Sequence, residues 1–236
     1  MKTLTAIAAI FSALILPACA DAAKDKPKTE APLTEEQKSL YSLGVLMSQS
    51  ISTFNLTPEE VAVVQKGIAD GISGKKSAEE AQADVPKIQE LQKTRMAAAG
   101  EKAAAAGVAF LEGKSKEAGF TKTASGMLIK HTQEGKGTSP AATDQVKVHY
   151  EGRLIDGKVF DSSIARGEPA TFPLNGVIAC WTEGVQTMKV GGKAQLTCPA
   201  SLAYGPQGSP PTIPPESTLV FDVELRKIVK EEAPKK

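Results

Sequence analysis

The sequence has little net charge and few histidines, and each shortage excludes a class of function. Among 236 residues, 28 Lys and Arg stand against 27 Asp and Glu, without a local block of basic residues. Nucleic-acid binding normally requires a concentrated basic surface, so no nucleic-acid partner is expected. The two histidines, His131 and His149, do not have the spacing of a zinc site.

Other patterns of catalytic chemistry are missing as well. The sequence contains no glycine-rich phosphate loop, and no Ser, Cys or Lys stands in a recognisable nucleophile context. We therefore expect no metal and no cofactor. Hydrophobic residues still make up 41% of the chain, which is enough for one or two globular domains.

The first 20 residues predict an export signal. Lys2 precedes an apolar run over residues 4–16, and small residues follow at 18–20. The run is too short for a membrane-spanning helix, which needs roughly 20 apolar residues. Two processing hypotheses stay open: cleavage at an A-x-A site, or lipidation of Cys19 in a lipobox-like segment. Both place the protein in the periplasm or at the outer membrane or cell surface, with residues 21–33 as a flexible leader.

The chain beyond the export signal keeps two cysteines, Cys180 and Cys198. In an oxidising compartment they could form a disulfide. The alternative, which we favour from the sequence, is that both are small buried side chains without a bond between them.

Residues 34–85 predict a helical domain, and residues 86–119 predict a long connecting helix. Thr34 and Thr57 are typical helix caps, and Pro58 suits the first helical position. Apolar residues recur at helical spacing and form one stripe on each of the first two helices: Leu40, Leu43, Met47, Ile51 and Phe54, then Val61, Val64, Ile68 and Ile72. The connecting helix is rich in Ala, Lys, Glu and Gln, which indicates a mostly solvated helix.

Two short amphipathic helices cannot bury both stripes by themselves, because so small a domain has little interior. We therefore expect a homodimer in which two copies of residues 34–75 pack against each other. The alternative is a monomer whose helical hairpin folds back on the C-terminal domain.

After Gly119 the hydrophobic period changes to that of β-structure. Residues 146–150 alternate strictly, and Asp156-Gly157 between two apolar runs is a strong hairpin signal. Further strands are predicted near 127–129, 194–198 and 218–225, with a short helix over 181–188. Residues 122–230 thus predict a twisted antiparallel sheet with one small helix, an α+β domain, followed by a tail at 231–236.

Six of the 11 aromatic residues of the chain gather in this second half. The group consists of Tyr150, Phe160, Phe172, Trp181, Tyr204 and Phe221. One acidic residue, Asp161, lies among them in the sequence. Such a cluster is either a domain core or a binding pocket.

Five segments around these residues carry a family resemblance. They are VHYEG at 148–152, LIDGKVFDSS at 154–163, VIxxWTEG at 177–184, LAYG at 202–205 and IPPxSTLVFDVEL at 213–225. In this order and spacing they resemble FKBP-type peptidyl-prolyl cis-trans isomerases. The helical half, the connecting helix and the export signal resemble the secreted bacterial subfamily of macrophage infectivity potentiators and FkpA-like isomerases.

The resemblance implies a pocket for a proline ring with Trp181 as its floor. Its walls would be Tyr150, Phe160, Val177, Ile178 and Phe221. Such an enzyme would accelerate X–Pro bond rotation in unfolded or flexible exported polypeptides, with chaperone activity beside it. An alternative of a different class is a holdase chaperone or binding module in which isomerisation is secondary.

The polar roles also follow from the resemblance. The Ile178 backbone N–H and the Tyr204 hydroxyl would donate hydrogen bonds to substrate carbonyls. Asp161 would lie near the twisting carbonyl together with Tyr150, although a cap at a strand end is the alternative for this residue. Ile213 would lie on the loop that flanks the groove.

Three departures from the family pattern bear on specificity. Ala170 stands where many members have an aromatic wall residue, which predicts a more open pocket. Ala179-Cys180 replaces a Pro-Gly pair, and the loop at 206–211 carries Ser209 where many members have His. These changes leave substrate preference and the affinity for macrolide inhibitors open.

Overall fold

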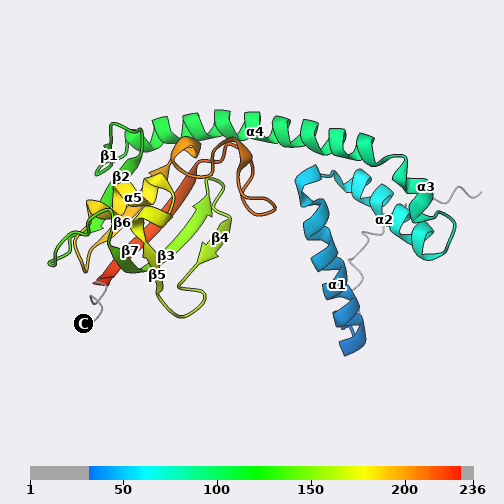
Figure 1. Cartoon of the computed structure of the whole chain (residues 1–236), viewed down its shortest axis with the longest axis horizontal. Coiled ribbons are helices and arrows are strands. Elements are labelled where there is room, and N and C mark those ends of the chain that lie inside the picture. Colours follow the sequence, from blue (N-terminus) through cyan, green and yellow to red (C-terminus); the bar gives the residue numbers. More distant parts are fainter. Residues whose placement is uncertain (1–31, 230–236) are drawn as a thin grey trace, which may run out of the picture. The chain divides into compact units, whose positions relative to one another are not determined.

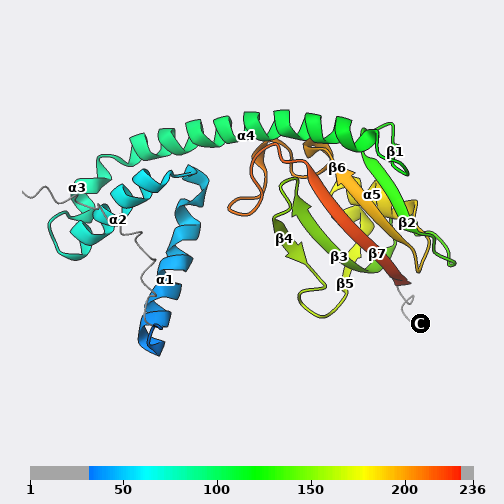
Figure 2. The ribbon, with the colours of Figure 1, turned by 180° about the vertical axis from the view of Figure 1, so that it is seen from behind.

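The computed structural model describes residues 32–229, which form the helices and strands of Figures 1 and 2. The predicted export signal, Cys19, most of the predicted leader and the predicted tail lie outside this range. Contacts divide the chain into a unit that ends at Tyr41 and a unit that begins at Ser42. None of the helices between residues 32 and 229 combines the length and the apolarity that crossing a bilayer requires.

The first two helices begin at the predicted caps. Helix α1 spans Glu35–Ile51, and the Thr34 hydroxyl accepts a hydrogen bond from the Gln37 N–H at 3.2 Å. A short 3₁₀ turn, η1 (Ser52–Phe54), leads to α2 (Pro58–Ile72), where the Thr57 and Glu60 side chains each accept a hydrogen bond from the other residue's N–H. Such reciprocal capping satisfies donors that the first helical turn leaves free.

The predicted long helix is present and mostly solvated. After the short α3 (Ala78–Gln82), helix α4 spans Val85–Ser115, and its buried residues are Gly100 and Gly107. Pro86 lies at the start of α4, where the missing N–H costs no intrahelical hydrogen bond. Arg95 of α4 forms an ion pair with Glu60 and donates to the Phe54 carbonyl at 3.1 Å, which joins α4 to α2 and η1.

The C-terminal half forms one antiparallel sheet. Its strands are β1 (Thr121–Lys122), β2 (Leu128–Gln133), β3 (Gln145–Leu154), β4 (Val159–Ser162), β5 (Ala170–Pro173), β6 (Lys193–Cys198) and β7 (Leu219–Val229). They are ordered β1-β2-β6-β7-β3-β4, with β5 paired to β3. The α+β prediction is confirmed, although the sequence pattern did not predict β1 or β5.

Strand β3 is central to this part of the sheet because β4, β5 and β7 all pair with it. Along one edge it pairs with β7 over its whole length, and along the other it pairs with β5 and then with β4. Val146, Val148 and Tyr150 alternate on its buried face, as the period of two predicted. The predicted hairpin joins β3 to β4, where Asp156 Oδ1 accepts the Lys158 N–H at 2.9 Å.

Helix α5 (Ala179–Gln186) covers the buried face of the sheet, as Figures 1 and 2 show from opposite sides. It begins two residues before the predicted range. Its buried residues include Trp181 and Val185, which pack in the core with residues of β3, β6 and β7. The 3₁₀ turns η2 (Leu174–Gly176), η3 (Ala200–Leu202) and η4 (Gly205–Gln207) complete the loops around this helix.

The preference for unbonded cysteines is wrong in this structure. Cys180 of α5 and Cys198 of β6 form a disulfide, with their Cα atoms 5.7 Å apart and both side chains fully buried. The sequence could not decide this, because 18 positions separate the two residues and only the packing of α5 on β6 brings them together. The bond fixes the first turn of α5 next to Trp181.

Candidate functional site

A cavity of about 330 Å³ opens between α5 and the strands that carry the aromatic cluster. Its lining residues are Tyr150, Phe160, Asp161, Phe172, Gly176, Val177, Ile178, Trp181, Tyr204 and Phe221. They come from β3, β4, β5, η2, α5, the loop before η4, and β7. Segments separated by up to 71 positions therefore meet around one hollow.

Trp181 is the centre of the aromatic lining. Its ring meets Tyr150, Phe172 and Phe221 edge to face, with centroid separations of 5.1, 5.7 and 5.5 Å. Phe160 extends the lining through an edge-to-face contact with Phe221 at 5.6 Å. Aromatic pairs in this geometry are favourable beyond the area they bury. The floor and walls therefore support one another as a shaped apolar surface.

Gly152 allows two of these rings to approach the sheet. It lies in β3 opposite Phe221 of β7 and opposite Asp161 of β4. A Cβ atom at this position would lie 2.6 Å from Cζ of Phe160 and 2.9 Å from Cε1 of Phe221. A larger residue would displace the rings, so the glycine of the hairpin strand is part of the pocket's construction.

The polar side of the cavity is a three-residue network. The Tyr150 hydroxyl donates a hydrogen bond to Asp161, and Arg166 forms an ion pair with the other oxygen of the same carboxylate. Arg166 also donates to the Tyr150 hydroxyl oxygen at 3.0 Å, and its guanidinium lies 5.6 Å from the centre of the Tyr150 ring. Asp161 is thus held by two side-chain partners at the edge of the cavity.

The network keeps its groups in fixed protonation states. Burial alone would raise the pKa of the Asp161 carboxyl, but hydrogen bonds from Tyr150 and Arg166 outweigh it and hold this pKa below its usual value. Burial and the neighbouring Asp161 raise the pKa of the Tyr150 hydroxyl. At neutral pH the site therefore presents a carboxylate, a protonated phenol and a guanidinium.

Two hydrogen-bond donors flank the apolar lining. Ile178 is the residue at the N-terminal cap of α5, and its N–H has no acceptor among residues 32–229. Tyr204 also lines the cavity and is 43% exposed. The cavity thus combines an aromatic floor with donors at its rim, an arrangement suited to an apolar ring between peptide carbonyls.

The structure brings together all but one of the predicted site residues. Ile213 does not line this cavity; it is buried on the loop between η4 and β7, with its side chain in the core. Phe172 and Gly176 line the cavity without having been predicted as site residues, and Arg166 was missed in the polar network. Phe172 had one available signal, its membership of the aromatic cluster. Arg166 had none, because its loop lacks a regular pattern.

Two family models match this chain along most of its length. Residues 136–226 match the model described as FKBP-type peptidyl-prolyl cis-trans isomerase. Residues 36–130 match the model described as the domain amino terminal to FKBP-type peptidyl-prolyl isomerase. The helical half therefore precedes the sheet domain here, as the corresponding domain does in that family.

Individual relatives agree with these models. The FKBP-type 22 kDa peptidyl-prolyl cis-trans isomerase of Escherichia coli is 43% identical over 83% of this chain and 97% of its own length. FkpA of Aeromonas hydrophila is 42% identical over 87% of this chain and 81% of its own length. Mip of Coxiella burnetii is 36% identical over 84% of this chain and 88% of its own length. The crystal structure of FkpA from Escherichia coli superposes with a TM-score of 0.64 at 36% identity, over 86% of this chain and all of that one. The chain belongs to the family of FKBP-type peptidyl-prolyl cis-trans isomerases.

Proposed function

We propose that the aromatic cavity binds the proline ring of an X–Pro segment and accelerates rotation about the preceding peptide bond. The observation that carries this proposal is the ring of edge-to-face aromatics around Trp181 with Asp161, Tyr150 and Tyr204 at its edge. The substrates are unfolded or flexible polypeptides that contain proline. A protease-coupled assay with a short X–Pro peptide tests the proposal, which fails if the wild-type chain does not accelerate isomerisation.

The reaction breaks no covalent bond, so the catalyst needs only a pocket of suitable shape and suitable electrostatics. Rotation of an amide bond crosses a barrier of about 18–20 kcal/mol because the planar amide loses its resonance on twisting. Uncatalysed exchange of an X–Pro bond takes tens to hundreds of seconds. A site that binds the twisted amide about 7 kcal/mol more tightly than the planar one gives roughly five decades in rate.

Each part of the cavity has a role in such differential binding. Trp181 holds the apolar proline ring, and the Ile178 N–H and the Tyr204 hydroxyl donate to the carbonyls on either side of it. Asp161 fixes the Tyr150 hydroxyl and Arg166 in place near the twisting carbonyl. Polar groups that are already oriented stabilise the transition state without reorganising during the reaction.

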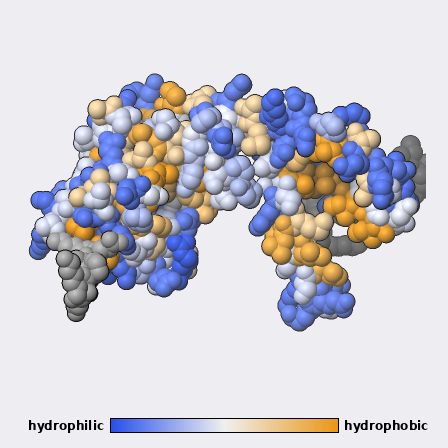
Figure 3. All heavy atoms as spheres, in the orientation of Figure 1, coloured by the Kyte–Doolittle hydropathy of each residue, from blue (hydrophilic) through white to orange (hydrophobic). Residues whose placement is uncertain are grey.

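We also propose a homodimer formed through residues 34–75. Neither α1 nor α2 has a buried residue, and Figure 3 shows hydrophobic residues gathered on these helices. Exposed side chains there include Leu43, Met47, Val61, Ile68 and Ile72, the last of them 85% exposed. An apolar surface of this kind is normally covered in solution.

Sedimentation tests the dimer. The chain without residues 1–20 is expected to sediment as a dimer at micromolar concentration. The double variant Val61→Asp with Ile68→Asp places two charges on the apolar stripe of α2, so we expect it to sediment as a monomer with unchanged turnover of a short X–Pro peptide. Ala62→Asp with Ala69→Asp adds the same two charges at exposed positions beside the stripe and serves as the control. A wild-type chain of monomer mass would overturn the dimer.

The same exposed helices favour a second candidate function, a holdase chaperone that binds unfolded chains. Removal of residues 21–90 takes away α1 and α2 and leaves the aromatic cavity. We expect the shortened chain to retain turnover of a short peptide and to lose suppression of client aggregation. Aggregation suppression that survives the truncation would exclude the helical half as the chaperone surface.

Export places this activity outside the inner membrane in our proposal. The buried disulfide supports an oxidising compartment, since such bonds persist in the periplasm and outside the cell. Mass spectrometry of the mature N-terminus from membrane and soluble fractions separates a lipidated Cys19 from simple cleavage.

A further inference from the structure

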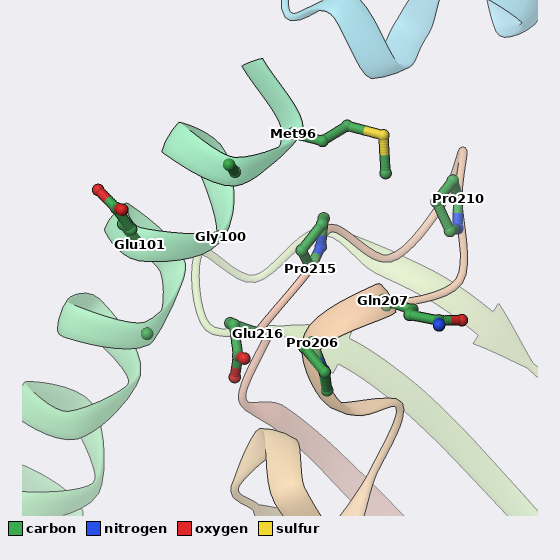
Figure 4. Close-up of a pocket in the computed structure, with 11 residues that line it drawn as sticks. Met96, Gly100, Glu101, Pro206, Gln207, Pro210, Pro215 and Glu216 are labelled. Atoms are coloured by element: carbon green, nitrogen blue, oxygen red, sulfur yellow. The ribbon is translucent and has the colours of Figure 1, made fainter. Parts of the chain in front are cut away.

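A second, larger hollow is lined in part by the loop that follows Tyr204. It has a volume of about 840 Å³ and separates α4 from the loop at residues 206–216 (Figure 4). Its apolar lining comes from Met96, Ala97 and Ala104 of α4 and from Pro206, Pro210 and Pro215 of the loop. We call this hollow the α4 groove.

The α4 groove is built from elements that hold each other in place. A Cβ atom at Gly100 would lie 3.1 Å from Cβ of Pro215, so this glycine lets helix and loop meet at the base of the groove. The Ser209 and Ile213 N–H groups donate to each other's carbonyls at 2.8 and 2.9 Å, and the Glu216 N–H donates to the Gly205 carbonyl at 3.0 Å. A wall with its hydrogen bonds already made costs little to order when a ligand binds.

One loop contributes residues to both the isomerase site and the α4 groove. Tyr204 lines the aromatic cavity, and Pro206, two positions later, lines the groove. An extended polypeptide advances about 3.3 Å per residue, so a chain with its proline in the cavity needs few further residues to cross this loop. The apolar helix face and the rigid prolines then offer it a second contact.

Charge indicates which polypeptide suits the α4 groove. Among residues 32–229, the charged residues that line it are Glu101 and Glu216, and no Lys or Arg does. Glu216 lies between helix and loop, whereas the Glu101 side chain extends from α4 away from the loop (Figure 4). Arg95 and Lys102 line a different hollow on the neighbouring face of α4. Acidic groups at the edge of an apolar groove favour a basic ligand and disfavour an acidic one.

We propose that the α4 groove binds the stretch of client polypeptide next to the isomerised proline, with a preference for apolar residues accompanied by Lys or Arg. This subsite rests on the proposed isomerase function and adds to it a selection of clients by sequence beyond the proline. Short peptides fill the aromatic cavity alone. Longer basic and apolar clients fill both.

The test compares two substrates and two matched variants of the chain without residues 1–20. One substrate is a short Ala-Leu-Pro-Phe peptide, and the other extends this core on both sides with Leu, Val and Lys. Ala97→Trp fills the α4 groove from an exposed helix position, and Ala98→Trp makes the same change on the face that lines the other hollow. The readouts are kcat/KM for each peptide and fluorescence anisotropy of the labelled long peptide.

We expect the wild-type chain to favour the long peptide by about threefold, which corresponds to about 0.7 kcal/mol because 1.4 kcal/mol is a factor of ten. Ala97→Trp should abolish that advantage and leave the short peptide unaffected, whereas Ala98→Trp should change neither. Replacing the Lys residues of the long peptide with Glu should lower its kcat/KM and its binding.

Several results would overturn the subsite. One is an equal kcat/KM of the wild-type chain for the two peptides. The others are an equal loss of that advantage in the two Trp variants, or equal binding of the Lys and Glu peptides in the anisotropy measurement. A changed sedimentation mass for Ala97→Trp alone would assign the groove to contact between copies of the chain. If the wild-type chain turns over neither peptide, the isomerase proposal fails, and anisotropy with the two Trp variants still decides the groove.

Discussion

Replacing Asp161 with alanine is expected to lower kcat/KM for a short X–Pro peptide by about 10- to 100-fold. The change leaves the Tyr150 hydroxyl without its acceptor and Arg166 without its ion-pair partner beside the cavity. Hydrogen bonds to a charged group contribute about 1.5–3 kcal/mol, which corresponds to this range of rate. The protease-coupled assay measures the loss.

Asp156→Asn is the matched control for this variant. Asp156 lies in the hairpin turn outside the aromatic cavity, and asparagine keeps the Oδ1 acceptor for the Lys158 N–H. We expect it to retain wild-type turnover. Equal activities for the wild-type chain, Asp161→Ala and the double variant Tyr204→Ala with Phe221→Ala would refute the assignment of the site.

The pH profile of kcat/KM tests whether turnover requires the negative charge of Asp161. Because its pKa lies below the usual 3.8, the carboxylate persists as the pH falls to that value, and its contribution is lost only below it. Because the pKa of the Tyr150 hydroxyl is raised above its usual 10.0, the phenol stays mostly protonated as the pH rises to that value. In Arg166→Ala the carboxyl loses a donor and a neighbouring cation, so its pKa rises and the acid limb of kcat/KM moves to higher pH. Circular dichroism at each pH separates this shift from acid unfolding, and an unmoved limb contradicts the positioning role of Arg166.

Loss of the Cys180–Cys198 disulfide is expected to lower the free energy of unfolding by about 3 kcal/mol and the midpoint of thermal unfolding by about 10 °C. The bond closes a loop across 18 positions and joins the first turn of α5 to β6. Without it the unfolded chain gains freedom, and α5 can lift Trp181 from the pocket. The double variant Cys180→Ala with Cys198→Ala is measured by calorimetry and denaturant titration.

The reduced wild-type chain is the control that separates the bond from the packing. It retains both sulfur atoms, which are fully buried, so its difference from the oxidised chain reports the cross-link without a cavity. We expect reduction to be slow under native conditions because the sulfurs have no access to solvent. Equal denaturation midpoints for the two forms, or two free thiols in a denaturing, non-reducing titration, would contradict the stabilising bridge.

Local sequence signals accounted for most of the secondary structure because neighbouring residues determine it. The caps at Thr34 and Thr57, the turn at Asp156-Gly157 and the alternation over 146–150 each depend on contacts within a few positions. Strand β5 was missed because its four residues are too few for a period and end at Pro173. The family motifs predicted aromatic residues that the structure brings together around one cavity, because the spacing of the motifs reflects the fold.

The sequence by itself determined the helices, the hairpin and the family, since each depends on short motifs with fixed spacing. Only the tertiary structure decided the Cys180–Cys198 bond, the place of Arg166 in the network and the existence of the α4 groove. Each depends on surfaces that meet across many positions: α5 on β6, a loop on β3, and Gly100 of α4 on Pro215. Contacts at that separation are set by how the elements pack, and packing has no local signature in the chain.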